Sequence, residues 1–149
     1  MDIKSPEERS RNMSKIRSRD TRPEVYLRKK LFARGFRYRT SPSNIYGHPD
    51  IWLARYRTAI FMNGCFWHRH AGCRYAYMPK SRVEFWQEKF HRNVEQDEKV
   101  HATLRKQGIR CLVVWECTIR KMMRSKETEQ AVLRQIEDFL HGSDPHLEL

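Results

Sequence analysis

Four side chains that can bind a metal constrain the fold of this chain more than any other feature. Cys65, His70 and Cys73 lie within nine residues of one another, and Cys117 follows much later. Residues 63–80 show neither helical nor strand periodicity, so they are expected to form a structured loop without a core of its own. Three thiols and one imidazole match the ligand set of a four-coordinate structural zinc site. We therefore expect Zn²⁺ to fasten this loop to the region around Cys117.

Alternatives to this ligand set stay open at the level of sequence. A scatter of buried thiols would give the same composition, whereas disulfides are disfavoured in a reducing compartment. By spacing alone, His68 could replace His70 as the ligand. The histidine that is left free could take a proton from an attacking water near neutral pH. Cys111 lies within an apolar run and is expected to be a small core residue.

The remaining pattern predicts an α/β fold. Helices are expected where apolar residues recur at helical spacing, over residues 21–34, 81–106 and 125–141. Strands are expected over 36–39, 50–54, 58–62 and 109–115. The last of these runs is almost continuously apolar, which is typical of an interior strand. The order of elements predicts a central mixed β-sheet flanked by helices.

The charge of the chain indicates the class of its partner. The 149 residues include 30 Lys and Arg but only 18 Asp and Glu, so the formal net charge is +12. A compact domain this basic repels itself, and a polyanion such as nucleic acid relieves that repulsion. No apolar run approaches the roughly 20 residues of a membrane helix, and the first residues lack the apolar stretch of a secretory signal. We expect a soluble intracellular protein with no membrane partner.

The chain is long enough for one compact domain. Residues 1–20 are polar and rich in Arg and Lys, and they are expected to form a basic arm that orders on a partner, with a frayed terminus as the alternative. The domain itself is expected to span residues 21–141. Residues 142–149 are expected to be a disordered tail.

Two further features point to chemistry on a nucleic acid. Asp50 follows a proline at the mouth of a predicted strand, where a carboxylate can hold a divalent cation near phosphate, although Pro and Asp are also common in turns. Phe66 and Trp67 are adjacent on the loop and cannot both point into one core. Together with Trp86 they are expected to stack on or between bases, with core packing as the alternative.

Taken together, these residues resemble the very short patch repair endonucleases, a branch of the PD-(D/E)XK restriction-endonuclease-like superfamily. The likeness covers nearly the whole chain and is most specific in Gly47-His48-Pro49-Asp50, Gly64-Cys65-Phe66-Trp67-His68 and Trp115-Glu116-Cys117. The resemblance implies a restriction-endonuclease-like fold and a strand-specific nick 5′ of the thymine in double-stranded DNA with a T·G mismatch. Such mismatches arise when 5-methylcytosine deaminates. It also implies a bacterial, cytoplasmic and nucleoid-associated enzyme that works with mismatch-repair proteins and a DNA polymerase. A monomer is expected because a single-strand nick needs one active site, with a dimer as the alternative.

The resemblance also implies roles for individual residues. Asp50 and the backbone carbonyl of Met62 would bind a catalytic Mg²⁺, with Glu24 acting through metal-bound water. His68 would be the general base, oriented by Asp97. Further residues would contact DNA: Phe66, Trp67 and Trp86 as wedges, Met13 from the minor groove, and Lys89 and Asn93 as readers of bases.

One departure from the superfamily pattern and three rival functions accompany this prediction. Met62-Asn63-Gly64 lacks the superfamily's acidic residue and lysine, and the branch relies on a histidine instead, which fits His68. Members of the branch often carry Thr-His at the first two of these positions, so the role of Asn63 stays open. The rivals are a zinc-stapled DNA-binding module without catalysis, a restriction-type endonuclease that cuts both strands, and a zinc hydrolase. The last is disfavoured because four protein ligands leave no open position for water.

Overall fold

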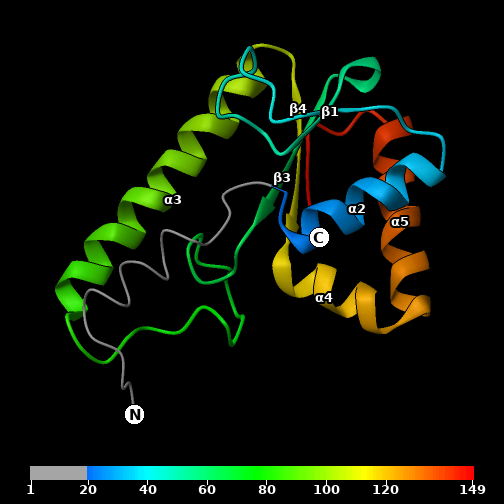
Figure 1. The fold of residues 1–149 in the computed structure, drawn as a ribbon. Coiled ribbons are helices and arrows are strands. Elements are labelled where there is room, and N and C mark those ends of the chain that lie inside the picture. The colour runs from blue at the N-terminus through cyan, green and yellow to red at the C-terminus, as the bar shows by residue number, and fades with distance from the viewer. Residues whose placement is uncertain (1–19) are drawn as a thin grey trace.

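A computed structural model describes residues 20–149 (Figure 1). Residues 1–19 of the predicted basic arm, Met13 among them, lie outside the described residues. Five strands form one sheet in the order β1-β2-β3-β4-β5. Their bounds are Arg39–Thr40, Ile51–Leu53, Thr58–Asn63, Arg110–Trp115 and His146–Glu148. The first three strands pair antiparallel, whereas β4 is parallel to both of its neighbours, so the sheet is mixed as predicted.

Helices cover both faces of this sheet (Figure 1). Their bounds are Arg22–Ala33 for α2, Val83–Lys106 for α3, Glu116–Arg124 for α4 and Lys126–His141 for α5. Residues of α2, α4 and α5 form a hydrophobic core with one sheet face, and Val100 and Leu104 of α3 pack with Ala59 and Cys111 on the other. The expected α/β architecture and the buried position of Cys111 are therefore confirmed. Within the described residues, none of the helices is long and apolar enough to cross a membrane.

The start of α2 follows from its capping residues. The side chain of Thr21 accepts a hydrogen bond from the backbone N–H of Glu24, and Pro23 lies in the first turn, where its missing N–H costs nothing. Gly35 follows the helix with a φ of +95°, a conformation that glycine adopts without strain. This local pattern brings the first turn of α2 to the end of the sheet where β3 ends.

The C-terminal tail differs from the sequence prediction. Residues 142–149 were expected to be disordered, but His146–Glu148 form β5 parallel to β4. The backbone N–H of Trp115 donates to Leu149 O at 2.9 Å, and the N–H of Leu149 donates to Val113 O at 2.9 Å. The tail thus satisfies backbone groups of β4 that would otherwise form an open sheet edge. A second difference is α4, which the sequence analysis left unassigned.

Candidate active site

Asp50 immediately precedes β2 and is tied to the end of β3. Its Oδ2 accepts a hydrogen bond from the backbone N–H of Met62 at 2.7 Å. Burial raises the pKa of Asp50 from 3.8 to about 6; the Met62 N–H opposes this shift, and the nearby Glu24 carboxylate adds to it. A buried carboxylate beside a second carboxylate is stabilised by a cation, so Asp50 is a candidate metal ligand.

The backbone carbonyl of Met62 points to the same edge as Asp50. Arg57 O accepts from the N–H of Arg110, and the backbone groups of successive residues alternate between the two edges of a strand. The backbone N–H and C=O of Met62 therefore point toward β2. However, β2 begins at Ile51, which pairs with Ile60, so no residue of β2 pairs with Met62. The carbonyl of Met62 thus lies beyond the ladder between these strands. A carboxylate and a carbonyl oxygen are donors that suit a hard divalent cation.

Glu24 is 7% exposed and lies in the first turn of α2. Its Oε2 accepts from the backbone N–H of Asp20 at 2.8 Å, while the backbone N–H of Glu24 is 3.5 Å from Thr21 Oγ1. This arrangement resembles a capping box. Glu24 therefore has a structural task at the helix start, and it is also close enough to Asp50 to raise the pKa of that carboxyl.

His68 on the loop is paired with Asp97 on α3. Its Nδ1 lies 2.6 Å from Asp97 Oδ2, with the two side chains 33% and 26% exposed. Because an ionised carboxylate only accepts, this bond places the proton of a neutral imidazole on Nδ1 and leaves Nε2 with its lone pair. His68 is also close enough to Asp50 to lower the pKa of that carboxyl. The arrangement can orient a general base beside a candidate metal ligand.

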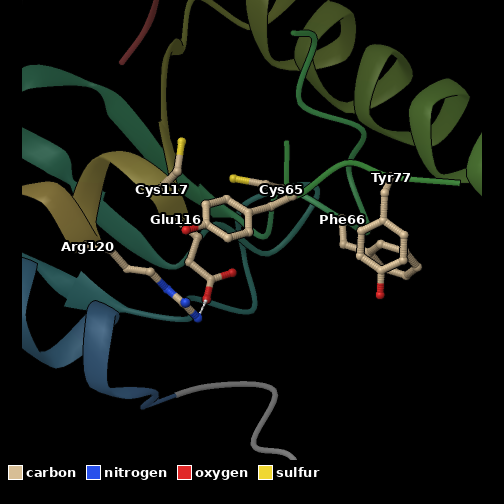
Figure 2. Close-up of a pocket in the computed structure, with 7 residues that line it drawn as sticks. Cys65, Phe66, Tyr77, Glu116, Cys117 and Arg120 are labelled. Atoms are coloured by element: carbon tan, nitrogen blue, oxygen red, sulfur yellow. Dashed lines mark hydrogen bonds and ion pairs between the residues drawn. The ribbon is translucent and has the colours of Figure 1, made fainter. Parts of the chain in front are cut away.

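A small pocket lies between this loop and α4 (Figure 2). It has a volume of about 210 Å³ and is lined by Cys65, Phe66, Tyr75, Tyr77, Glu116, Cys117 and Arg120. Glu116 Oε1 accepts from Arg120 at 2.6 Å. Its Oε2 lies 3.5 Å from the position that a Cβ on Gly64 would occupy. The first turn of α4 thus contacts the chain directly after β3.

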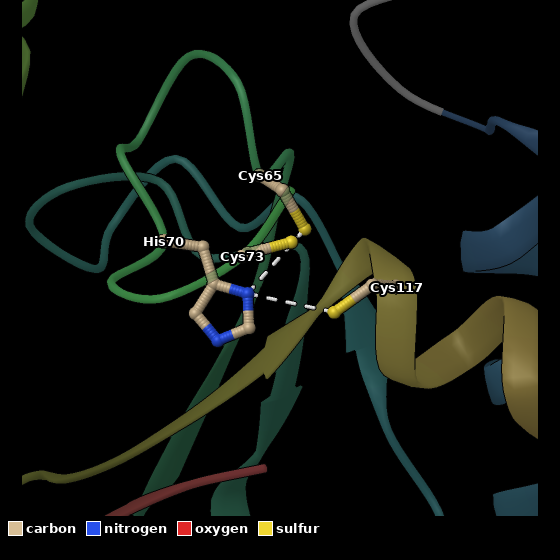
Figure 3. A group of neighbouring side chains, drawn as sticks. All are labelled: Cys65, His70, Cys73 and Cys117. Atoms are coloured by element: carbon tan, nitrogen blue, oxygen red, sulfur yellow. Dashed lines mark hydrogen bonds between the residues drawn. The ribbon is translucent and has the colours of Figure 1, made fainter. Parts of the chain in front are cut away.

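The four predicted metal ligands converge at one point (Figure 3). The ligand atoms of Cys65, His70, Cys73 and Cys117 all lie within 4.8 Å of one another. His70 Nδ1 is 3.6 Å from Cys65 Sγ and 3.4 Å from Cys117 Sγ. Tetrahedral zinc, with bonds of about 2.3 Å to sulfur and about 2.0 Å to nitrogen, needs such separations. The geometry therefore places His70 in the cluster and leaves His68 with Asp97, a choice that spacing had left open.

The chemistry of these thiols fits a metal site. Burial raises the pKa of Cys65 to about 12, so this thiol would be protonated without a metal. Metal ligation needs the thiolate and therefore favours its formation. The donor set of three sulfurs and one nitrogen suits a closed structural site.

The metal cluster rests on β4 and on the C-terminal strand, a relation that the sequence analysis missed. The ring of Trp115 stacks on the imidazole of His70, with centroids 4.2 Å apart and planes at 7°. The indole Nε1–H donates to Glu148 Oε1 at 3.0 Å. Burial lowers the pKa of His70, while the nearby Glu148 carboxylate opposes this shift. The only signal for this arrangement in the sequence was the proximity of Trp115 to Cys117.

The predicted aromatic wedge residues form one cluster between the loop and α3. The Phe66 ring lies 5.2 Å from Trp67, 5.6 Å from Trp86 and 5.1 Å from Phe90, and Trp67 lies 5.8 Å from Trp86. Phe66, Trp67 and Trp86 are half-buried, so they are neither free wedges nor core residues. The cluster presents an aromatic edge to solvent while its base is fixed.

Two residues predicted to read bases lie beside this cluster. Asn93 Nδ2 donates to Trp67 O at 3.0 Å, and Lys89 Nζ lies 5.9 Å from the centre of the Trp67 ring. With Trp86 they occupy positions i, i+3 and i+7 on one face of α3. In the protein without DNA, Asn93 therefore holds the loop in position, a role that the sequence did not reveal.

Arg69 is a further residue whose role the sequence analysis missed. Its guanidinium donates to the backbone oxygens of Phe66, Ala76 and Tyr77 at 2.8–3.1 Å, and it lies 3.9 Å from the centre of the Phe90 ring. One side chain thus satisfies three carbonyls of a loop without regular structure. The position of Arg69 between His68 and His70, two candidate site residues, was the available signal.

Comparison with known proteins identifies the family of the chain. The family model described as DNA mismatch endonuclease Vsr matches residues 1–74. The chain is 42% identical to the type II nicking enzyme V.NmeAIP of Neisseria meningitidis serogroup A, over 92% of this chain and 97% of the relative. It is 38% identical to the DNA mismatch endonuclease Vsr of Escherichia coli K12, over 95% and 88%. It is 41% identical to V.XorIIP of Xanthomonas oryzae pv. oryzae, over 77% and 84%. The chain therefore belongs to the Vsr family and is a DNA-nicking endonuclease, an enzyme that hydrolyses phosphodiester bonds.

Proposed function

We propose that this enzyme nicks one strand of duplex DNA 5′ of the thymine in a T·G mismatch and so initiates very short patch repair. The mismatches would be those left by deamination of 5-methylcytosine. The observation that carries the proposal is the 2.6 Å contact of His68 with Asp97 next to the buried carboxylate of Asp50. The name of the Escherichia coli relative, a DNA mismatch endonuclease, supports the choice of substrate.

Some of the catalytic residues bind a cation, and others provide a general base. Asp50 and the carbonyl of Met62 would hold Mg²⁺, which when bound supplies positive charge at the scissile phosphate. His68 Nε2 takes the proton of the attacking water, and Asp97 fixes the tautomer and stabilises the imidazolium that forms. Glu24 orients water beside Asp50. Cys65, His70, Cys73 and Cys117 hold Zn²⁺, which keeps the loop that carries His68 in place.

Selectivity for the mismatch follows from the energy needed to deform the duplex. A wobble pair costs less to unstack than a matched pair, so aromatic side chains that enter the stack favour T·G. Phe66, Trp67 and Trp86 are the wedge, and Lys89 and Asn93 read neighbouring bases. Met13 enters from the minor groove.

The cellular setting follows from the same repair role. A single-strand nick needs one active site, so we propose a monomer. We place its action in the bacterial cytoplasm at the nucleoid. Mismatch-repair proteins and a DNA polymerase would act before and after the nick.

The test uses end-labelled duplexes that carry one T·G pair, with matched T·A and C·G duplexes as controls. The purified protein is incubated with each duplex in the presence and absence of Mg²⁺. A nick 5′ of the thymine only in the T·G duplex and only with Mg²⁺ is expected. Equal cleavage of all duplexes, a linear product from both strands, or binding without cleavage would reject the proposal.

A further inference from the structure

A basic surface with hollows lies along α4, outside the catalytic residues described above, and residues of the metal cluster line two of its hollows. Three hollows of about 210, 430 and 460 Å³ adjoin one another there. The first two share Glu116 and Arg120, and the last two share Arg124. We call this surface the α4 groove, and its cationic residues are Arg22, Arg74, Arg120, Lys121 and Arg124.

Most of these cations have no carboxylate partner. Arg120 is engaged by Glu116 at 2.6 Å. For Arg22, Arg74, Lys121 and Arg124, no carboxylate of residues 20–149 lies within 4.0 Å of the charged group. By contrast, Arg28 and Lys30 on the adjacent α2 and Arg34 at its C-cap each form an ion pair. The α4 groove therefore concentrates positive charge that no carboxylate of residues 20–149 neutralises by a direct ion pair, apart from that of Arg120.

The α4 groove begins at the catalytic end of the sheet. Glu116, on its wall, reaches Gly64, which comes two residues after Met62. Arg22, on its other wall, precedes Glu24 by two residues on α2. A strand whose phosphate lies at Asp50 can therefore continue directly into this groove.

We propose that the α4 groove binds the phosphodiester backbone of the DNA next to the nicked bond, with Arg74, Lys121 and Arg124 each contacting a phosphate. Phosphate is the matching ligand because guanidinium and ammonium groups pair with it and exchange condensed counterions for protein charge. Apolar and aromatic side chains such as Pro23, Met123 and Tyr75 also line the hollows, so the choice of phosphate rests on the charge of the α4 groove. This assignment needs only that the substrate is DNA, and it does not depend on the choice of mismatch.

The experiment measures the salt dependence of binding to a fully matched duplex without Mg²⁺, so that neither cleavage nor mismatch recognition enters. The full-length triple variant Arg74→Gln, Lys121→Gln, Arg124→Gln is compared with the wild type. Its matched control, Arg55→Gln, Arg105→Gln, Lys106→Gln, loses the same charge from exposed side chains near the start of β3 and β4, at the opposite end of the sheet. Thermal melting verifies that all variants are folded.

Each phosphate contact contributes about 0.9 to the slope of log K against log salt concentration. We expect the slope of the groove variant to be shallower by about 2.7, and that of the control variant to stay within about 0.5 of the wild type. Arg74→Lys with Arg124→Lys should retain the wild-type slope.

Two results would overturn the proposal. One is an equal change of slope in the groove and control variants, which would mean that only net charge matters. The other is a wild-type slope in the groove variant, with wild-type protein that inorganic phosphate stabilises against thermal melting in a saturable way at constant ionic strength. That outcome would indicate a site for a single free anion rather than for a DNA backbone.

Discussion

Asp50 and His68 differ in what their hydrogen bonds do. The bond from the Met62 N–H fixes the Asp50 carboxylate in a buried position where its charge is unfavourable, so the site is prepared for a cation at a cost in stability. The bond to Asp97 fixes the orientation of the His68 imidazole and places the proton of its neutral form on Nδ1. Each residue thus has a measurable signature of its own.

Replacement of His68 by Ala should lower the nicking rate by about 10²–10⁴-fold, because the proton of the attacking water has no acceptor. Affinity for the T·G duplex should stay within about threefold, since the replaced group carries no charge contact to phosphate in this proposal. Asp97→Asn should give a smaller loss. Single-turnover nicking and filter binding measure the two effects; an unchanged rate in His68→Ala would exclude it as the base.

Replacement of Asp50 by Asn should abolish nicking yet stabilise the protein in the absence of Mg²⁺. The pKa of Asp50 is raised from 3.8 to about 6 by burial, so the folded state loses stability as pH rises through this window and the carboxyl ionises. At pH 8 the variant should gain about 3 kcal/mol in the free energy of unfolding. The gain should vanish near pH 4. Urea unfolding at both pH values measures it, and a less stable variant at pH 8 would contradict the assignment.

At the scale of elements, most helices and the interior strands were predictable, whereas α4 and β5 were missed and the strand expected over 36–39 is confined to Arg39–Thr40. The run 109–115 and the helix to Lys106 follow from local periodicity, which the structure confirms. The tail was misjudged because β5 is only three residues long and forms through pairing with β4. Such a strand depends on a partner edge that local sequence does not display. For the same reason, the stacking of Trp115 on His70 could not be predicted.

Replacement of Cys117 by Ser tests whether the loop depends on its metal. One zinc per chain should be bound by the wild type and much less by the variant, because three remaining ligands hold the ion less well. The melting temperature should fall by several degrees, since the loop has no core of its own. Cys111→Ala is the matched control and should retain zinc. Metal analysis and calorimetry decide; equal zinc in both variants would exclude Cys117 as a ligand.

The C-terminal strand should slow the loss of that metal. Glu148→Ala removes the acceptor of the Trp115 indole N–H and frees the ring that stacks on His70. Outer contacts of this kind change metal affinity by about tenfold or more, so transfer of zinc to a chromophoric chelator should accelerate by about tenfold. Glu148→Gln keeps an acceptor oxygen and should release zinc at nearly the wild-type rate. If Glu148→Ala released zinc as slowly as Glu148→Gln and the wild type, the strand would have no such role.

At the scale of the whole molecule, two surfaces have different tasks. The net charge of +12 and the α4 groove attract any duplex through its phosphates, a term that falls with salt and carries no sequence information. The cluster of Phe66, Trp67 and Trp86 contributes through the energy needed to unstack one base step. Composition predicts the first task, whereas the second requires the half-buried geometry that holds the rings together.

This division predicts how salt and mutation act on selectivity. Raising KCl from 50 to 200 mM should lower kcat/KM for T·G and T·A duplexes in parallel and leave their ratio within about twofold, because the phosphates of both are alike. Trp67→Ala should instead reduce the ratio by about tenfold or more, because no indole ring then stacks in the space that unstacking of the wobble pair opens. Nicking rates of both duplexes at both salt concentrations measure this. If salt collapses the ratio while Trp67→Ala leaves it unchanged, then selectivity arises from phosphate contacts and the aromatic cluster only supports the loop.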